Sequence, residues 1–346
     1  MTNIIKCVKF MLLGLLAGFI AACDKSTQDT NSNQNSQQEV SMQGETLKLV
    51  FPQWQGGDIA GFFKDLEPSE AAKGYVLGAQ ILDLLTRDIN PALDKNTALV
   101  EVSLDFSVDS KEARIVQDGI IDKTILQTQN ANALKILREK NPTKILTLGG
   151  ECAVSVAPFS YLADKYKSEV ALIWIDAHPD LGVAGDEFYK GYHAMAVSAL
   201  IGDKELQKEF NLSASISPQN TLFIGLHSNE ANHYDARRKS LGIKSIAGEE
   251  FMRNEAEALG EISAWVKSRG QSGVKKMLIH LDLDVLNPRE LYIAVGDSGV
   301  LTVAQVISAI NAVSENAEVV GLTIAEHFPK AQLQLKELLK NLPLIR

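Results

Sequence analysis

The sequence has few cysteines, no excess of basic residues and only a short apolar run near its N-terminus. Three cysteines occur among 346 residues, at Cys7, Cys23 and Cys152. The apolar run at residues 10–20 is shorter than the about 20 residues that a membrane-spanning helix needs. Lys and Arg total 34 against 43 Asp and Glu, a formal charge of −9. This balance argues against nucleic acid or an anionic membrane surface as a partner.

The first residues have the pattern of an export signal. Lys6 and Lys9 precede the apolar run, and small residues lead up to Cys23, as in a signal-peptide cleavage site. The segment resembles the lipobox of bacterial lipoproteins, which implies cleavage after residue 22 and lipidation of Cys23. Asp24 resembles an inner-membrane retention signal. We therefore expect an exported protein that is lipid-anchored to a membrane and faces the periplasm. An ordinary signal peptide or an uncleaved anchor helix is the alternative.

The remaining chain divides into a tether and one domain. Residues 23–44 are mostly Ser, Thr, Asn, Gln and Asp and cannot bury enough apolar surface to offset ordering entropy. After removal of the signal peptide (1–22), they are expected to form a flexible tether that joins the lipidated Cys23 to a folded domain (45–346). In the mature protein Cys152 would be the only unmodified thiol, which excludes an intrachain disulfide.

Apolar runs of strand length alternate with segments of helical period through the domain, which predicts a doubly wound, mainly parallel α/β sheet. The segment 170–175 is apolar on both faces, as in a parallel strand that is covered by helices on both sides. Predicted strands are 47–51, 98–104, 144–148, 170–175, 221–226, 276–283 and 318–324. Predicted helices are 69–88, 111–140, 155–167, 190–201, 230–240, 255–269, 302–316 and 330–341.

Polar groups follow four of these strands, at the edge where an open parallel sheet binds ligands. In Asp176-x-His178-x-Asp180 and Asp282-x-Asp284, alternate side chains point the same way and can converge. Carboxylates gathered in an apolar sheet repel one another unless a cation is present. The two motifs together predict a metal site. Acids at loop starts, or a histidine satisfied by one carboxylate, are the alternatives for either motif alone.

These motifs resemble signatures of the arginase/agmatinase (ureohydrolase) family. Residues 172–180 resemble its Asp-Ala-His-x-Asp motif, and residues 280–288 resemble its Ser-x-Asp-x-Asp-x-x-Asp-Pro motif. Gly149-Gly150-Glu151-Cys152 lies where the family has Gly-Gly-Asp-His, and Glu326 resembles a late strand-end glutamate. The resemblance implies a three-layer α/β/α fold with two metal ions, usually manganese, bridged by hydroxide.

The resemblance also implies roles for individual residues. The implied metal ligands are Asp176 and Asp282 as bridges, His178 and Asp284 at one ion, and Asp180 and Cys152 at the other. Asp180 is also expected to act in catalysis, and His193 to pass a proton to the leaving amine. Glu326 is expected to bind a guanidinium or amidine cation. His193 as a helix-start residue and Glu326 as a helix N-terminal acid are the non-catalytic alternatives.

Three departures from the family pattern bear on chemistry. Cys152 replaces a histidine ligand, and a thiolate favours zinc or iron over manganese; a single ion, or a buried thiol without metal, is the alternative. His280 replaces a serine and is interpreted as a supporting residue rather than a ligand. Segment 181–190 lacks the Ser/Asn-rich contacts of arginases, so arginine is not supported as the substrate.

The predicted function is metal-dependent hydrolysis of C–N bonds in a guanidino or amidino compound. A single-metal amide or deacetylase-type hydrolase, or an inactive metal- or ligand-binding lipoprotein, is the alternative. The expected cofactor is one or two divalent ions: manganese by resemblance, zinc or iron because of Cys152. The expected partners are a small cationic guanidino or amidino substrate and the membrane, which is contacted through the lipid anchor only. A homo-oligomer is compatible with the sequence, and no nucleic-acid partner is expected.

Overall fold

The computed structural model describes residues 46–63, 65–107, 114–227, 234–296 and 298–345. The predicted signal peptide, the tether and Cys23 lie outside the described residues. No helix within the described ranges is both long and apolar enough to cross a membrane.

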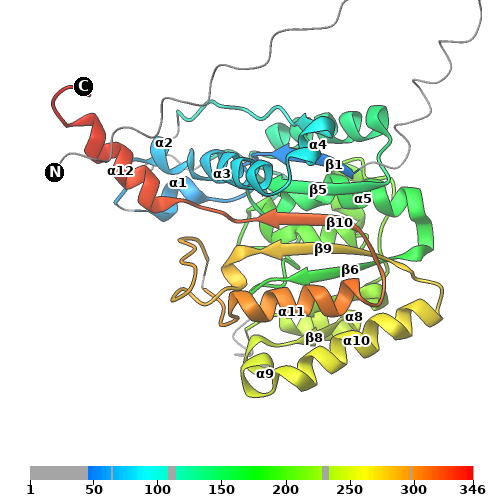
Figure 1. Cartoon of the computed structure of the whole chain (residues 1–346). Helices are drawn as coiled ribbons and strands as arrows, with labels where there is room; N and C mark the ends of the chain where they lie inside the picture. Colours follow the sequence, from blue (N-terminus) through cyan, green and yellow to red (C-terminus); the bar gives the residue numbers. More distant parts are fainter. Residues whose placement is uncertain (1–45, 64, 108–113, 228–233, 297, 346) are drawn as a thin grey trace, which may run out of the picture. The chain divides into compact units, whose positions relative to one another are not determined.

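An eight-stranded sheet forms the centre of the domain, and every strand pair in it is parallel. The strand order is β2-β1-β5-β10-β9-β6-β7-β8 (Figure 1). The strands are β1 (Thr46–Phe51), β2 (Thr97–Leu99), β5 (Lys144–Gly149), β6 (Val170–Ile175), β7 (Thr221–Ile224), β8 (Lys244–Ile246), β9 (Lys276–Asp282) and β10 (Glu318–Ala325). The mainly parallel α/β sheet that the sequence predicts is confirmed.

Helices connect the strands and cover both faces of the sheet. The α-helices are α1 (Ile59–Phe62), α2 (Pro68–Ala71), α3 (Gly74–Ile89), α4 (Lys123–Lys140), α5 (Val156–Tyr166), α6 (Ala196–Leu200), α7 (Lys204–Glu209), α8 (Asp235–Leu241), α9 (Gly248–Arg253), α10 (Glu255–Gln271), α11 (Val303–Ser314) and α12 (Lys330–Lys340). Short 3-10 turns are η1 (Pro91–Asn96), η2 (Cys152–Ser155), η3 (Lys167–Glu169), η4 (Tyr192–Met195), η5 (Pro218–Asn220) and η6 (Leu283–Val285).

The core lies in two layers, one on each face of the sheet. Along β6, Leu172 and Trp174 pack into the layer that contains α4, α5 and α6. The intervening Ile173 and Ile175 pack into the layer that contains α10 and α11, which lie in front of the sheet in Figure 1. All six residues of β6 are buried, which explains its uninterrupted apolar run. The arrangement is the three-layer α/β/α fold that the family resemblance implied.

The chain order places a switch point at the middle of the sheet. After β5 the chain crosses to β6, and β9 and β10 later fill the gap between them. Open parallel sheets bind ligands at such a point, beyond the carboxyl ends of the strands. The four strands that precede the polar motifs are these four neighbours, β5, β10, β9 and β6.

Residues 114–122 differ from the prediction of one helix over 111–140. A two-stranded antiparallel ribbon, β3 (Val116–Gln117) and β4 (Ile120–Ile121), precedes α4. Asp118 and Gly119 between the strands have φ values of 47° and 80°, as the type I′ hairpin turn requires. The Asp118-Gly119 pair is a hairpin-turn sequence. Its turn preference prevailed over the helical spacing of the apolar residues around it, on which the prediction of one helix was based.

Both edge strands were poorly predicted. The expected strand 98–104 is only β2 (Thr97–Leu99), and β8 (Lys244–Ile246) was not anticipated. Each pairs on one side only, so each is short and only partly buried and lacks the continuous apolar run of a central strand. The expected helix 69–88 is divided into α2 and α3.

Candidate metal centre

The predicted site residues meet in one cavity at the carboxyl ends of β5, β10, β9 and β6. The cavity has a volume of about 690 Å³. Its lining includes Cys152, His178, Asp180, His193, Asp282, Asp284 and Glu326. Asp176 is buried beside them and contributes to both donor clusters described below. Four separate strand ends therefore bring their polar groups to one place.

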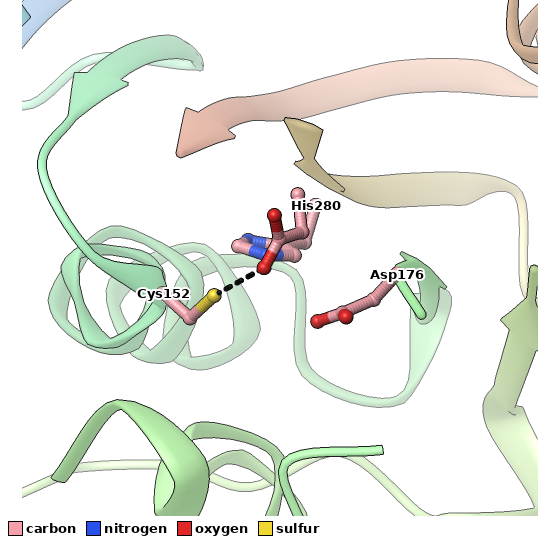
Figure 2. Close-up of side chains that lie close together, drawn as sticks. Cys152, Asp176 and His280 are labelled. Carbon is pink, nitrogen blue, oxygen red and sulfur yellow. Dashed lines mark hydrogen bonds between the residues drawn. The ribbon is translucent and has the colours of Figure 1, made fainter. Parts of the chain in front are cut away.

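The first donor cluster consists of Cys152, Asp176, Asp282 and His280. One donor atom from each residue lies within 4.8 Å of the others, and Cys152 and Asp176 approach the same space from opposite sides (Figure 2). The thiol of Cys152 donates to Asp282 Oδ2 at 3.0 Å, the dashed line in Figure 2. All four residues are buried.

The second donor cluster consists of Asp176, His178 and Asp284. His178 Nδ1 lies 3.0 Å from Asp284 Oδ2 and 3.6 Å from Asp176 Oδ1. Asp176 belongs to both clusters, so its carboxylate is placed between two neighbouring donor sets. This geometry suits a pair of ions that share a bridging carboxylate.

A repeated backbone interaction shapes both aspartate motifs. Asp176 Oδ1 accepts the His178 N–H at 2.6 Å, and Asp282 Oδ1 accepts the Asp284 N–H at 2.7 Å. An aspartate that bonds the backbone two residues later forms an Asx turn. The turn bends the chain just past the strand, which directs the side chain two positions later into the same cavity. The one-residue spacing within each motif follows from this turn.

Asp180 shares the cavity but lies outside both donor clusters. Its backbone has a φ of 45°, and its carbonyl accepts the Val197 N–H at 3.1 Å. Its buried Oδ2 has no hydrogen-bond partner among the described residues. Burial, reinforced by Asp176, raises the pKa of Asp180 well above its usual range.

The electrostatics of the site call for a cation. Burial, reinforced by Asp284, raises the pKa of Asp282, and burial raises the pKa of Asp284 to about 6 although His178 opposes the shift. Burial together with Asp282 raises the pKa of the Cys152 thiol. Carboxylates, imidazoles and a thiol are ligands of divalent transition metals. The unpartnered Oδ2 of Asp180 and Nε2 of His280 offer further donor atoms, so the residues present fit such an ion.

The first cluster includes one ring of an aromatic stack, formed by His280 and Trp174. His280 on β9 pairs in register with Trp174 on β6, and their rings are parallel within 10° at 3.6 Å between centroids. Trp174 Nε1 donates to Asp176 Oδ2 at 2.8 Å, and Ser155 Oγ lies 2.8 Å from His280 Nδ1. Burial lowers the pKa of His280 to about 3, so its imidazole is neutral.

Comparison with known proteins agrees with this architecture. The model of the family described as "Arginase family" matches residues 87–336. The chain belongs to the arginase family. The arginase of Staphylococcus aureus (strain MRSA252) is 28% identical over 189 residues, which cover 53% of this chain and 60% of that protein. The chain thus spans about 60% of the length of this curated relative.

Solved structures of arginase-family proteins have the same fold. Arginase from Bacillus caldovelox superposes with a TM-score of 0.63 at 17% identity and covers 83% of this chain and 91% of its own. Formimidoylglutamase from Bacillus subtilis superposes with a TM-score of 0.56 at 15% identity and covers 90% and 89%. This arginase-family chain therefore has the family fold over most of its length.

Glu326 and His193 form the second half of the arginase-family cavity. Glu326 follows β10 with a φ of 63°, and its Oε1 accepts the Cys152 N–H at 3.1 Å. Its Oε2 accepts a hydrogen bond from the Tyr75 hydroxyl. His193 Nδ1 lies 3.5 Å from Glu326 Oε1, and its Nε2 lies 2.9 Å from the Tyr189 hydroxyl. Burial acts to lower the pKa of His193, but Tyr189 and Glu326 outweigh it and raise that pKa.

Sequence reasoning missed the residues that hold these groups in place. Tyr75 comes from the first turn of α3 and Gln53 from the loop after β1; Gln53 Nε2 donates to the buried Glu151. Neither lies in a motif, and no local signal distinguishes either from an ordinary core or loop residue. His280 was assigned to a supporting role, whereas the structure places one of its ring nitrogens within the first donor cluster.

Proposed function

We propose that this chain is a metal-dependent hydrolase of C–N bonds in a guanidino or amidino compound. The observation that carries the proposal is the pair of donor clusters sharing Asp176, in a cavity that also holds a buried glutamate and a buried histidine. Membership of the arginase family supports it. The alternatives are a single-metal amide or deacetylase-type hydrolase and an inactive metal-binding protein.

The metal ligands proposed are Cys152, Asp176, His178, Asp180, Asp282 and Asp284. When bound, a divalent ion supplies an activated water nucleophile, because it lowers the pKa of a water molecule to about 7. Manganese is the ion that the family resemblance favours, and zinc or iron suits the thiol of Cys152 better.

The remaining residues bind and orient the substrate and move protons. Glu326 offers a carboxylate to a planar cation, and the Tyr75 hydroxyl and the Cys152 N–H hold that carboxylate in place. Asp180 has an unpartnered oxygen with which to orient the attacking water. His193 lies beside Glu326 and, with its pKa raised, carries a proton that it can donate to the leaving nitrogen.

The cavity lining favours a cationic substrate without a carboxylate group. Among the described residues of the lining are five acids, and none is Lys or Arg. The apolar and aromatic residues in the lining include Ile59, Phe62, Tyr75, Phe188, Tyr189, Tyr234 and Val295. An α-carboxylate would therefore face five acids and no Lys or Arg among the described residues of the lining. We propose a guanidino or amidino cation with an apolar or amine-bearing chain, in preference to arginine.

The test is a substrate panel with a metal-ligand variant. Full-length protein loaded with Mn²⁺ or Zn²⁺ is assayed for urea or ammonia release from guanidino and amidino compounds, with and without a carboxylate, and for acyl-amide hydrolysis. We expect release from at least one carboxylate-free guanidino or amidino compound, and a fall of at least about a hundredfold in kcat/KM for Asp176→Asn. Turnover of acyl amides alone would support the deacetylase-type alternative, and no turnover with metal bound would support the inactive one.

We also propose that the chain is exported and anchored by lipid at Cys23 to a membrane facing the periplasm, the inner membrane being favoured by Asp24. The support is the sequence pattern of residues 1–24. Metabolic labelling with a radioactive fatty acid, followed by membrane fractionation, tests it. Cys23→Ala should abolish both labelling and membrane retention. Label retained on Cys23→Ala would contradict lipidation at this residue.

A further inference from the structure

His280 is buried beside the carboxylates of the first donor cluster. It lies two residues before Asp282 on β9, so both side chains leave the same face of the sheet. Trp174 lies two residues before Asp176 on the neighbouring strand and stacks flat against the His280 ring. The imidazole is 0% exposed. Its plane is therefore fixed by the stack, and one edge of the ring is aimed toward the cluster.

One ring nitrogen of His280 has no other use in the structure. Nδ1 lies 2.8 Å from Ser155 Oγ, whereas Nε2 is buried with no hydrogen-bond partner among the described residues. A buried polar atom without a partner carries a desolvation penalty of about 1–3 kcal/mol. Metal-bound histidines commonly donate from the second ring nitrogen to a nearby oxygen. Ser155 is placed to accept that bond, which would leave the Nε2 lone pair directed at an ion.

We propose that His280 is a metal ligand, and that with Cys152, Asp176 and Asp282 it forms a sulfur–nitrogen–oxygen site for a thiophilic divalent ion. The family resemblance places histidine at position 152 and serine at position 280; this chain has Cys152 and His280. Relative to the family pattern, this chain therefore has a thiol after β5, where the family has an imidazole, and an imidazole on β9, where the family has a hydroxyl. The inference rests on the metal centre of the proposed function and specifies which ion chemistry that centre uses.

The donor set determines the class of ion. The four donor atoms lie within 4.8 Å of one another, and donors around a tetrahedral zinc ion lie roughly 3.3–3.8 Å apart. Small side-chain shifts suffice to close the set around one ion. A thiolate and a neutral imidazole favour zinc or ferrous iron, whereas oxygen-rich sets suit manganese. Nearly every such site binds zinc more tightly than manganese, so the informative quantity is the change in preference between variants.

Cobalt(II) is the probe that reports sulfur and nitrogen ligation without turnover. Full-length protein is stripped with a chelator and titrated anaerobically with Co²⁺ while near-ultraviolet and visible absorption are recorded. We expect a thiolate-to-cobalt charge-transfer band that Cys152→Ser removes. His280→Ser should weaken binding of that ion by more than about a hundredfold and change the visible spectrum. Loss of a residue that only supports a ligand costs about 10- to 100-fold, the range expected for Ser155→Ala.

A matched control and a double variant complete the experiment. His327 also has an unpartnered ring nitrogen but lies outside both donor clusters, so His327→Gln should leave the cobalt spectrum unchanged. Cys152→His combined with His280→Ser restores the family's residues. It should bind metal at least about tenfold more tightly than His280→Ser alone, lack the charge-transfer band, and shift the zinc/manganese preference toward manganese. If His280→Ser fails to fold, the missing charge-transfer band and the zinc/manganese preference of the double variant are compared with those of the wild type instead.

The outcomes separate this inference from the proposed function. A wild-type spectrum with an affinity loss of less than about a hundredfold in His280→Ser, the range of a supporting residue, would overturn the inference, whether or not the protein turns over substrate. An intact sulfur band that depends on His280, in a protein inactive against every guanidino and amidino compound, would support the inference and contradict the proposed function.

Discussion

At the scale of single residues, the donor clusters depend on close packing of atoms that carry no metal-binding chemistry. Gly296 has a φ of 69°, and a Cβ at this position would lie 2.6 Å from Asp284 Oδ2 and 3.0 Å from His178 Cε1. The absence of a side chain at Gly296 therefore leaves room for two ligands of the second cluster.

Gly296→Ala is expected to displace Asp284 and His178 and to reduce metal binding at the second cluster by about tenfold or more. It should also destabilise the fold by about 1 kcal/mol or more, because alanine is strained at a positive φ. Metal titration and denaturant unfolding measure the two effects. Gly260, an exposed residue of α10 with open space around it, is the control: Gly260→Ala should stabilise the protein by about 0.5–1 kcal/mol. Unchanged metal binding in Gly296→Ala would contradict the assignment of this cluster.

Tyr75→Phe removes the hydroxyl that donates to Glu326 and keeps the buried ring. We expect KM for a cationic substrate to rise by about tenfold or more, with kcat affected less, because a hydrogen bond to a charged group contributes about 1.5–3 kcal/mol. Steady-state kinetics separate KM from kcat. The control is Tyr161→Phe, which removes a hydroxyl bonded to Asn141 away from the cavity and should leave KM unchanged. An unaltered KM in Tyr75→Phe would mean that Glu326 does not bind the cation.

At the scale of elements, charge pairs attach the last helix to the second. Glu70 of α2 lies 2.7 Å from Lys336 and 3.3 Å from Lys340 of α12, and 2.8 Å from Lys73. Partial burial acts to raise the pKa of Glu70, but the lysines outweigh it and lower that pKa to about 2. Contacts that are 266 and 270 residues apart in sequence therefore hold α12 against α2.

Glu70→Gln is expected to lower stability by about 1 kcal/mol at neutral pH. A carboxylate whose folded pKa is depressed stabilises the fold above its unfolded pKa, about 4.3, and that contribution is lost as the pH falls toward the folded value. The difference between wild type and variant should therefore be constant above about pH 5 and shrink toward pH 2. Urea unfolding at several pH values measures it. Glu337→Gln, which removes an exposed ion pair with Lys340, should change stability by less than about 0.5 kcal/mol; an equal effect in both variants would contradict the role of Glu70.

At the scale of the whole molecule, the carboxylates gathered at the metal centre are expected to lower the stability of the metal-free protein. Asp176, Asp282 and Asp284 are buried at the ends of two adjacent central strands. Their mutual repulsion is relieved by a bound cation. Sites of this kind commonly lower the stability of the ligand-free protein in favour of function.

Asp282→Asn is expected to raise the stability of chelator-treated protein by about 1–2 kcal/mol and to remove the stabilisation that metal supplies. Wild type should gain about 2.7 kcal/mol at a metal concentration a hundred times Kd. Thermal unfolding with and without metal measures both. Asp164→Asn, at a half-buried position paired with Lys167, should alter neither value. A chelator-treated Asp282→Asn that is less stable than wild type would show that the carboxylates do not destabilise the protein without metal.

Assembly into a homo-oligomer stays a prediction, which light scattering can measure.

Much of the site could be predicted because its chemistry is local in the chain. The Asp-x-His-x-Asp and Asp-x-Asp motifs each follow a buried strand, and the carboxyl ends of parallel strands share one edge. Convergence of Asp176, His178, Asp282 and Asp284 therefore followed from the fold class. Tyr75 and Gln53, which were missed, and His280, which was assigned a supporting role, act through contacts that connect distant segments. Tyr75 and Glu326 are 251 residues apart, and no periodicity indicates such a pair.

The sequence alone determined the alternation of strands and helices and the residues at the strand ends, because periodicity and turn chemistry act between near neighbours. Only the tertiary structure decided the strand order, which inserts β9 and β10 between β5 and β6. That order places β9 beside β6, stacks Trp174 on His280, and brings Cys152 to Asp282. Strand pairing depends on packing across the whole sheet, so the donor set of the first cluster could not be derived from any one segment.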